Sequence, residues 1–187
     1  MPKTIDNLRE NILSQAKEIL INDGYENLNM RKVAQNTGIA TGTVYNYFPT
    51  KKDLLTQLMM DYWEDYLKIF EKIDKEQEDL YAKLRLAYLE LEKFIGIIRD
   101  IWMRAGTSSS IKPTQQGEIG KRDFTERLIK RLEVIIEGYY EINSKSFSME
   151  LNAYEISKFI ILNFFMMAQM KQFEYDKFEK IIIKVIN

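Results

Sequence analysis

Apolar side chains recur every three to four residues along most of the chain, which is the spacing that turns one face of an α-helix towards a core. Residues 5–22 show this first, with Leu8, Ile12, Ala16 and Ile19 on one stripe. Clear alternation of the kind found in strands is scarce. The pattern therefore predicts an all-α fold with about nine helices in total.

Short helices with strong stop signals fill the first fifty residues. Asn29 is a good N-cap for a second helix, and Gly38 allows the positive φ that a tight turn between helices needs. Pro49 breaks the third helix, and Thr50 is suited to cap the fourth. Three helices are expected here, over residues 5–22, 30–36 and 41–47.

Longer helices are predicted after residue 50. The stripe on residues 51–74 is too wide for a helix packed on one side only, so we expect this helix to serve two environments. Gly96 is expected to bend the next helix into two pieces, and Ser148 or Asn152 to cap a later one. The further helices are expected over residues 80–95, 121–141 and 152–172, with a last one ending near residue 185. We therefore expect two domains, residues 1–50 and 51–187.

The composition removes several classes of chemistry. The chain has no cysteine and no histidine, so disulfides, thiolate nucleophiles, the usual zinc sites and the commonest general base are absent. The sequence offers no catalytic residue, no metal site and no cofactor site, and we expect a protein that is not an enzyme. The longest apolar tract, residues 159–170, is shorter than the ~20 residues of a membrane helix, so the expected compartment is the cytoplasm.

Charge is distributed unevenly although the net charge is only −1. Residues 29–52 hold Arg31, Lys32, Lys51 and Lys52 and no acidic side chain, so the rest of the chain carries −5. A local positive face on an acidic body can bind phosphates through that face alone. This distribution favours a DNA-binding region within the first domain.

The third predicted helix carries groups suited to the major groove. In a helix-turn-helix the second helix of the pair reads base edges. Thr41 and Thr43 offer short hydroxyl side chains at its start, and Gly42 lets the backbone approach closely. Lys51 stands in the first turn of the next helix, where its cation and the helix N-terminus both favour a phosphate.

Residues 8–55 resemble the DNA-binding domain of the TetR (tetracycline repressor) family. The pattern small-x-x-x-Gly-Ile-x-x-Gly-x-Val-Tyr-x-Tyr-Phe-x-x-Lys-x-x-Leu is met from Ala34 to Leu54. The resemblance covers about a quarter of the chain and implies binding to double-stranded DNA, for which a two-fold dimer would require a palindromic operator. It assigns base edges to Thr41, Gly42 and Thr43. It assigns phosphates to Tyr45, Asn46, Tyr47 and Lys51, with Asn29, Arg31 and Thr37 as further contacts.

One position departs from the family pattern. The family usually has Ser or Thr as the cap of the third helix, and this chain has Ala40, which loses a cap hydrogen bond of ~1 kcal/mol. Thr41 is then left with two alternative roles, capping the helix or reading a base.

The resemblance also implies a small-molecule effector in the second domain, and the apolar pattern there favours a homodimer. Large side chains with polar tips suit a pocket for a hydrophobic or aromatic ligand, although the same side chains can simply fill the core. The candidates are Trp63, Tyr66, Phe70, Tyr88, Phe94, Trp102, Met103 and Tyr139. The helix over residues 152–172 is apolar nearly all round, which favours a two-fold interface that it forms with the helix over residues 121–141. The interface candidates are Leu128, Leu132, Ile160, Phe164 and Met167.

The sequence thus predicts a dimeric transcription regulator, most simply a repressor that a ligand releases from its operator. Two alternatives remain. One is a helix-turn-helix protein that binds DNA without responding to a ligand. The other is a carrier of hydrophobic molecules that does not bind DNA, for which binding to duplex DNA would be negligible.

Overall fold

The computed structural model describes residues 5–105, 114–143, 151–170 and 174–186, and the side chains within these ranges except those of residues 5, 6, 97, 98 and 100–105. These residues form α-helices and one short 3₁₀ helix, with no strand among them, as the sequence predicts. The elements are α1 (Ile5–Asn22), η1 (Tyr25–Asn27), α2 (Met30–Thr37), α3 (Thr41–Tyr47), α4 (Lys51–Glu76), α5 (Leu80–Ala105), α6 (Gln115–Ile142), α7 (Ala153–Met170) and α8 (Tyr175–Ile186).

The described ranges hold eight α-helices where about nine were expected, and the bend predicted at Gly96 is the reason. α5 runs through Gly96 without a break. A glycine in a helix interior costs about 1 kcal/mol relative to alanine. Leu91, Phe94 and Ile95 are buried just before it, and burial of one such side chain is worth about 1.5–3 kcal/mol, which offsets that cost.

The chain divides into two compact units. Unit 1 comprises Met1–Tyr62 and Ile98–Gly120, and unit 2 comprises Trp63–Ile97 and Lys121–Asn187. α4 is one uninterrupted helix with residues in both units. The sequence predicted a domain boundary at residue 50, just before α4 begins. The division between the two compact units falls within α4. No helix in the described residues is long and apolar enough to span a bilayer.

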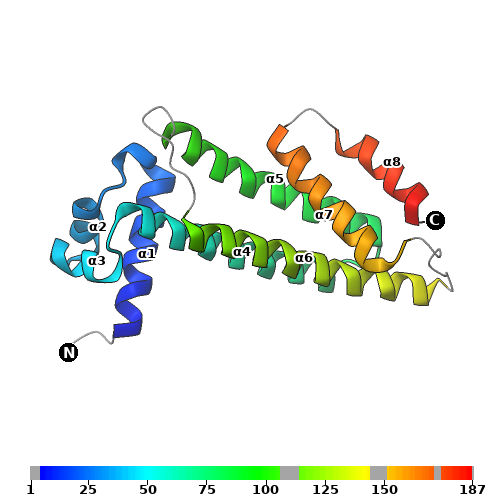
Figure 1. The fold of residues 1–187 in the computed structure, drawn as a ribbon, viewed down its shortest axis with the longest axis horizontal. Helices are drawn as coiled ribbons and strands as arrows, with labels where there is room; N and C mark the ends of the chain where they lie inside the picture. Colours follow the sequence, from blue (N-terminus) through cyan, green and yellow to red (C-terminus); the bar gives the residue numbers. More distant parts are fainter. Residues whose placement is uncertain (1–4, 106–113, 144–150, 171–173, 187) are drawn as a thin grey trace. The chain divides into compact units, whose positions relative to one another are not determined.

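In unit 1 the short helix α2 packs against α1, and α3 packs against α2 (Figure 1). Its core is formed by apolar side chains of the first four helices. Among these are Ile12, Ala16, Ile19, Val33, Ala34, Val44, Phe48, Leu54 and Leu58. Since Val44 and Phe48 are buried there, the opposite side of α3 is left facing outwards.

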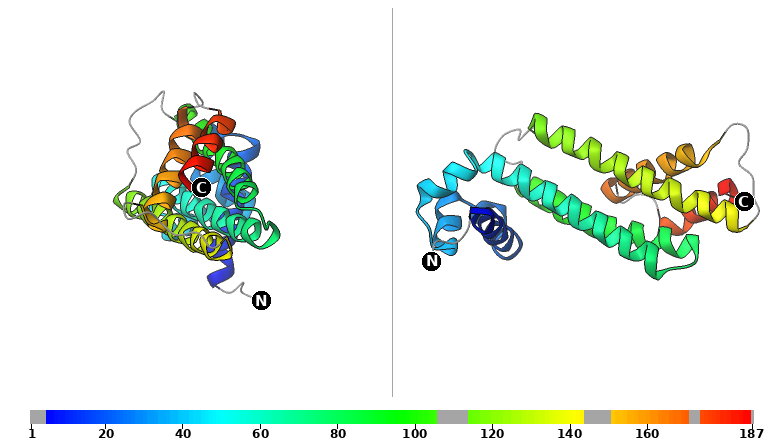
Figure 2. Two further views of the ribbon diagram at one scale, coloured as in Figure 1. Left: turned by 90° about the vertical axis from the view of Figure 1, so that its right-hand side faces the viewer. Right: turned by 90° about the horizontal axis from the view of Figure 1, so that it is seen from below.

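Unit 2 has a core of larger side chains from α4 to α8. α4 and α6 are joined by ion pairs of Glu64 with Arg127 and of Glu71 with Arg131. Asn152 caps α7 as predicted, accepting from the Glu155 N–H at 2.9 Å, while the Glu155 carboxylate accepts from the Asn152 N–H at 3.1 Å. α7 and α8 lie beside one another (Figure 2). The alternative cap, Ser148, lies outside the described residues.

Candidate nucleic-acid interface

The turn between α2 and α3 is fixed by its two ends. Asn29 caps α2, its Oδ1 accepting from the Lys32 N–H at 2.9 Å. Gly38 ends the helix at φ 72°, the left-handed conformation expected from the sequence. The N–H of Ile39 then donates to the Ala34 carbonyl at 3.0 Å, which closes the turn. The helix-turn-helix geometry predicted for residues 30–47 is therefore present.

α3 presents short polar groups on its outer side. Gly42 and Asn46 are exposed, and Thr41 and Thr43 are half-buried. Tyr45 is 48% exposed, so this ring stands on the surface. Tyr47, in contrast, packs its ring against the core of unit 1. Tyr45 is therefore more accessible to a binding partner than Tyr47.

Ala40 is the N-cap of α3, and no side chain caps this helix. The alternative in which Thr41 takes over the capping role is thus not realised. Thr41 makes no side-chain hydrogen bond to any other described residue. Its hydroxyl is consequently available to a partner outside the chain.

The start of α4 is held by a reciprocal cap, as the sequence indicated for Thr50. The Asp53 N–H donates to the Thr50 Oγ1 at 3.1 Å, and the Thr50 N–H donates to the Asp53 carboxylate at 3.0 Å. Asp53 therefore satisfies the helix end from within. Lys51, one residue after the cap, is half-buried, and Lys52 is exposed.

Lys51 is held by Tyr25 of η1. Its Nζ donates to the Tyr25 carbonyl at 3.0 Å and lies 3.8 Å from the centre of the Tyr25 ring. Burial lowers the pKa of the Lys51 ammonium and raises the pKa of the Tyr25 hydroxyl. The sequence gives no signal for this contact, because the two residues are 26 positions apart.

The further DNA contacts expected from the resemblance differ in availability. Asn29 uses its Oδ1 as the helix cap and donates from its Nδ2 to the Asn27 carbonyl at 3.3 Å. Thr37 donates its hydroxyl proton to the Val33 carbonyl at 2.7 Å. Arg31 is exposed and has no ion pair within the described residues. Arg31 is therefore the most available of these three contacts.

Not every cation of the positive face is free. Lys32 pairs with Asp23 at 2.8 Å, which neutralises part of the local charge. Asp23 lies outside residues 29–52, so a count of charges along the sequence missed it. Arg31, Lys51 and Lys52 remain without a carboxylate partner in the described ranges.

The aromatic effector candidates lie mainly in packed clusters of unit 2. Phe124 is central to one cluster, with the rings of Trp63, Tyr66 and Phe94 centred 5.8, 5.9 and 6.1 Å from it. The Tyr66 hydroxyl donates to the Ala87 carbonyl at 2.8 Å, and burial raises its pKa. These contacts support the core-filling alternative for Tyr66.

The other effector candidates are scattered. Tyr88 belongs to a second cluster, 5.3 Å from the Phe164 ring and 5.0 Å from the Tyr175 ring. Tyr139 contacts the Tyr81 ring at 6.2 Å, and Phe70 borders an open groove of about 480 Å³ between α4 and α6. The side chains of Trp102 and Met103 lie outside the described residues.

The five candidate dimer residues are inside unit 2. Leu128, Leu132, Ile160, Phe164 and Met167 are each at most 5% exposed in a single chain. In a single chain these side chains pack inside unit 2, although Met167 also lines a groove between α7 and α8. Periodicity showed that α7 is apolar nearly all round, but it could not tell which side packs inside the chain. The exposed apolar side chains of α7 are Phe159, Leu162, Met166 and Met170.

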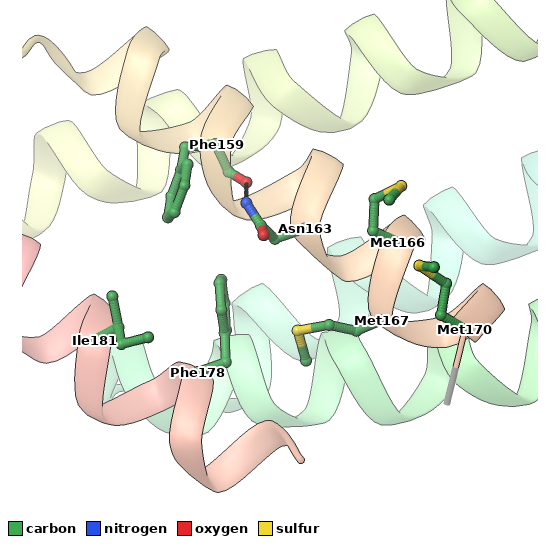
Figure 3. A pocket seen from close by; sticks show the side chains of 7 residues that line it. All are labelled: Phe159, Asn163, Met166, Met167, Met170, Phe178 and Ile181. Carbon is green, nitrogen blue, oxygen red and sulfur yellow. Dashed lines mark hydrogen bonds between the residues drawn. The ribbon is translucent and has the colours of Figure 1, made fainter. Parts of the chain in front are cut away.

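An apolar groove of about 370 Å³ runs between α7 and α8 (Figure 3). Figure 3 shows Phe159 of α7 pointing towards Phe178 and Ile181 of α8, and the Phe159 and Phe178 rings are 6.2 Å apart. Met166 and Met170 continue the groove along α7. The Asn163 amide in this lining donates to the Phe159 carbonyl at 2.8 Å, so its donor is satisfied within the chain.

Known proteins resemble the chain most clearly in unit 1. Residues 12–58 match the family described as bacterial regulatory proteins, tetR family. The fatty acid metabolism regulator protein of Bacillus subtilis is 27% identical over 131 residues, which are 70% of this chain and 61% of that protein. The transcriptional repressor KstR of Mycolicibacterium smegmatis is 36% identical over 88 residues, 47% of this chain and 40% of the repressor. The chain thus spans less than two thirds of the length of these relatives.

Solved structures share the fold over the whole chain. The transcriptional regulator FadR of Bacillus subtilis, solved in complex with stearoyl-CoA, has a TM-score of 0.61 at 16% identity, covering 95% of this chain and 96% of its own. A transcriptional regulator from Cytophaga hutchinsonii has a TM-score of 0.67 at 20% identity, covering 95% and 93%. The domain at residues 12–58 is thus a domain of the tetR family of bacterial regulatory proteins.

Proposed function

We propose that this protein is a homodimeric transcription regulator, a repressor rather than an enzyme, that acts on operator DNA in the cytoplasm and is released by a small hydrophobic ligand. One observation carries the DNA-binding part. The outer side of α3 and the start of α4 offer hydroxyls, an amide and cations, while Val44 and Phe48 anchor the opposite side in the core. Such a face fits the major groove and its flanking phosphates.

The residues divide by the groups that they offer to DNA. Thr41, Gly42 and Thr43 stand at the start of α3, the end of a recognition helix that contacts base edges. Asn46 and Tyr45 are exposed further along α3 and suit phosphates. Tyr47 contributes through its hydroxyl, Lys51 and Arg31 contribute charge, and Asn29 and Thr37 have their side-chain donors engaged within the chain.

The dimer is proposed to form through α7 and α8. Phe159, Leu162, Met166 and Met170 leave an apolar row exposed on α7, and Ile181 and Val185 do so on α8. Two helices from each copy would form a four-helix contact with two-fold symmetry. Such a dimer presents two recognition helices about 34 Å apart, which requires a palindromic operator.

The effector is proposed to be a hydrophobic molecule, and a long acyl chain or its coenzyme A ester is the first candidate. The Bacillus subtilis relative named for fatty acid metabolism supports this choice because its match extends well beyond the DNA-binding domain. Unit 2 is rich in apolar and aromatic side chains that can rearrange around such a chain.

The proposed mechanism is a shift between two arrangements of the recognition helices. α4 begins at Lys51 on the DNA-binding side and continues without a break into residues that pack in unit 2. A ligand that favours one position of α4 therefore changes the spacing of the recognition helices, and with it the affinity for the operator.

Selection of bound duplexes from a random pool tests the DNA-binding function. We expect a palindrome with half-sites one helical turn apart. Thr43→Ala is expected to change the preferred sequence, whereas Lys51→Ala is expected to weaken all duplexes alike and to flatten the salt dependence. Identical behaviour of the two variants would show that the assigned roles are wrong. Operator affinity that does not change with acyl-CoAs of different length would exclude that effector.

The dimer is tested by light scattering after size-exclusion chromatography. Met166→Glu places a charge in the exposed apolar row of α7 and is expected to give a monomer. Leu89→Glu introduces the same carboxylate at an exposed apolar site on α5 and serves as the control. A dimer that survives the first change, or a monomer produced by the second, would move the interface elsewhere.

A further inference from the structure

The ammonium of Lys51 occupies an unusual place for a surface cation. It is half-buried at the start of α4, and both of its contacts go to one residue, Tyr25. The backbone carbonyl of Tyr25 accepts a hydrogen bond at 3.0 Å, and its ring centre lies 3.8 Å from the Nζ. Gly24, at φ 82°, begins the 3₁₀ turn that brings Tyr25 to this position.

These contacts restrain Lys51 without neutralising it. No carboxylate pairs with Lys51 in the described residues, whereas Lys32 on the same face is paired with Asp23. An ammonium has three donors, and the carbonyl and the ring face occupy two directions. A partly buried cation with a donor to spare is stabilised by an anion that approaches from outside the chain.

Restraint before binding has a direct consequence for affinity. A free lysine side chain loses rotamer freedom when it grips a phosphate, and that loss opposes binding. Lys51 has already lost this freedom through its contacts with Tyr25. Lys52, the next residue, is exposed and has no such contact, so it would lose its freedom only on the DNA.

We propose that Tyr25 is a positioning residue for DNA binding, its ring holding the Lys51 ammonium ready for a backbone phosphate. The inference rests on the proposed DNA-binding function. Tyr25 acts through Lys51 and does not itself read bases. The competing explanation is that the pair only clamps α4 to η1 and contributes to folding.

Two variants separate the ring from its hydroxyl. Tyr25→Phe keeps the ring face and is expected to bind DNA as the unchanged protein does. Tyr25→Leu keeps apolar bulk but removes the attraction of the ring for the cation, and we expect binding about three- to tenfold weaker. The loss should be equal on a selected operator and on a random duplex of the same length, because phosphates carry no sequence information.

A double-mutant cycle identifies Lys51 as the route of the effect. Affinities are measured by fluorescence anisotropy for Tyr25→Leu, Lys51→Ala and the double variant, with Lys52→Ala as the matched control background. We expect Tyr25→Leu to have no further effect once Lys51 is alanine, and its full effect when Lys52 is alanine. A loss that persists without Lys51, or unchanged affinity with lower thermal stability, overturns the proposal.

A spectroscopic measurement covers the case in which Tyr25→Leu fails to fold. In NMR spectra of the full chain, the Tyr25 ring should shift the Lys51 ε-methylene resonances upfield. Addition of a DNA duplex should change the chemical shifts of these resonances, and the Lys52 resonances should respond differently. Unshifted Lys51 resonances in the free protein overturn the proposal. If the unchanged protein binds no duplex at all, the proposed function fails as well, which distinguishes that outcome from failure of the positioning role alone.

Discussion

Replacing Gly42 by alanine is expected to separate the stability of the protein from its binding of DNA. Gly42 lies in the seven-residue helix α3, is exposed, and would place a new Cβ with no heavy atom within 4 Å. Alanine is favoured over glycine in a helix by about 0.5–1 kcal/mol. The substitution is therefore expected to raise the free energy of unfolding by about that amount.

The same methyl group is expected to weaken DNA binding. If the backbone at Gly42 lies against the floor of the major groove, the Cβ occupies space that the DNA needs. Overpacking of a close contact costs about 1–3 kcal/mol, which corresponds to about 5- to 150-fold in affinity. Stability and affinity should thus change in opposite directions.

The assay combines urea unfolding with fluorescence anisotropy on a selected duplex. Gly138→Ala is the matched control, because Gly138 lies within α6 and an added Cβ there also meets no heavy atom within 4 Å. It should stabilise the protein similarly and leave affinity unchanged. Affinity retained in Gly42→Ala would refute the close approach of this backbone to DNA, and lower stability would refute the helix-propensity argument.

Three further changes test the fold around the site. Gly38→Ala should lower the free energy of unfolding by about 1–2 kcal/mol in urea, since φ is 72° there and no neighbouring atom obstructs a Cβ. Glu64→Gln should cost up to about 1 kcal/mol at neutral pH. Hydrogen bonding from Arg127 lowers the Glu64 pKa. The stabilisation by this pair is therefore complete above the ordinary glutamate pKa and is lost as the pH falls through the lowered pKa. In acid, the variant and the unchanged protein should have the same free energy of unfolding. Phe164→Ala should cost about 3–5 kcal/mol in equilibrium unfolding, whereas Leu86→Ala at an exposed site should cost far less.

Local signals predicted the elements of unit 1 closely. Asn29 and Thr50 cap helices, and Gly38 adopts a positive φ, because each of these features depends only on residues within a few positions. Gly96 was misjudged because a helix breaker acts locally, while the packing that overrides it comes from residues distant in the sequence. The lack of a capping side chain at Ala40 was also predicted, but its consequence for Thr41 required the structure.

The site was harder to predict because the tertiary structure decides whether a side chain is free to contact a partner. The residue types on α3 indicated a DNA-binding face, yet nothing in the sequence shows that Asn29 and Thr37 use their donors within the chain. The same holds for α7, where one apolar helix supplies buried Phe164 and exposed Met166 only two residues apart. Periodicity identifies a helix with two apolar sides, and only the neighbouring helices decide which of them is covered.

The contact of Tyr25 with Lys51 shows how local sequence signals and tertiary packing combine in one function. A lysine at a helix start suits a phosphate by charge and by the helix dipole, and that reasoning needs no structure. Whether the lysine is ready to bind depends on a residue 26 positions earlier, whose ring and carbonyl restrain it. If the double-mutant cycle shows the expected coupling, affinity for DNA in this chain depends on the packing beneath the binding face as well as on the residues that contact DNA.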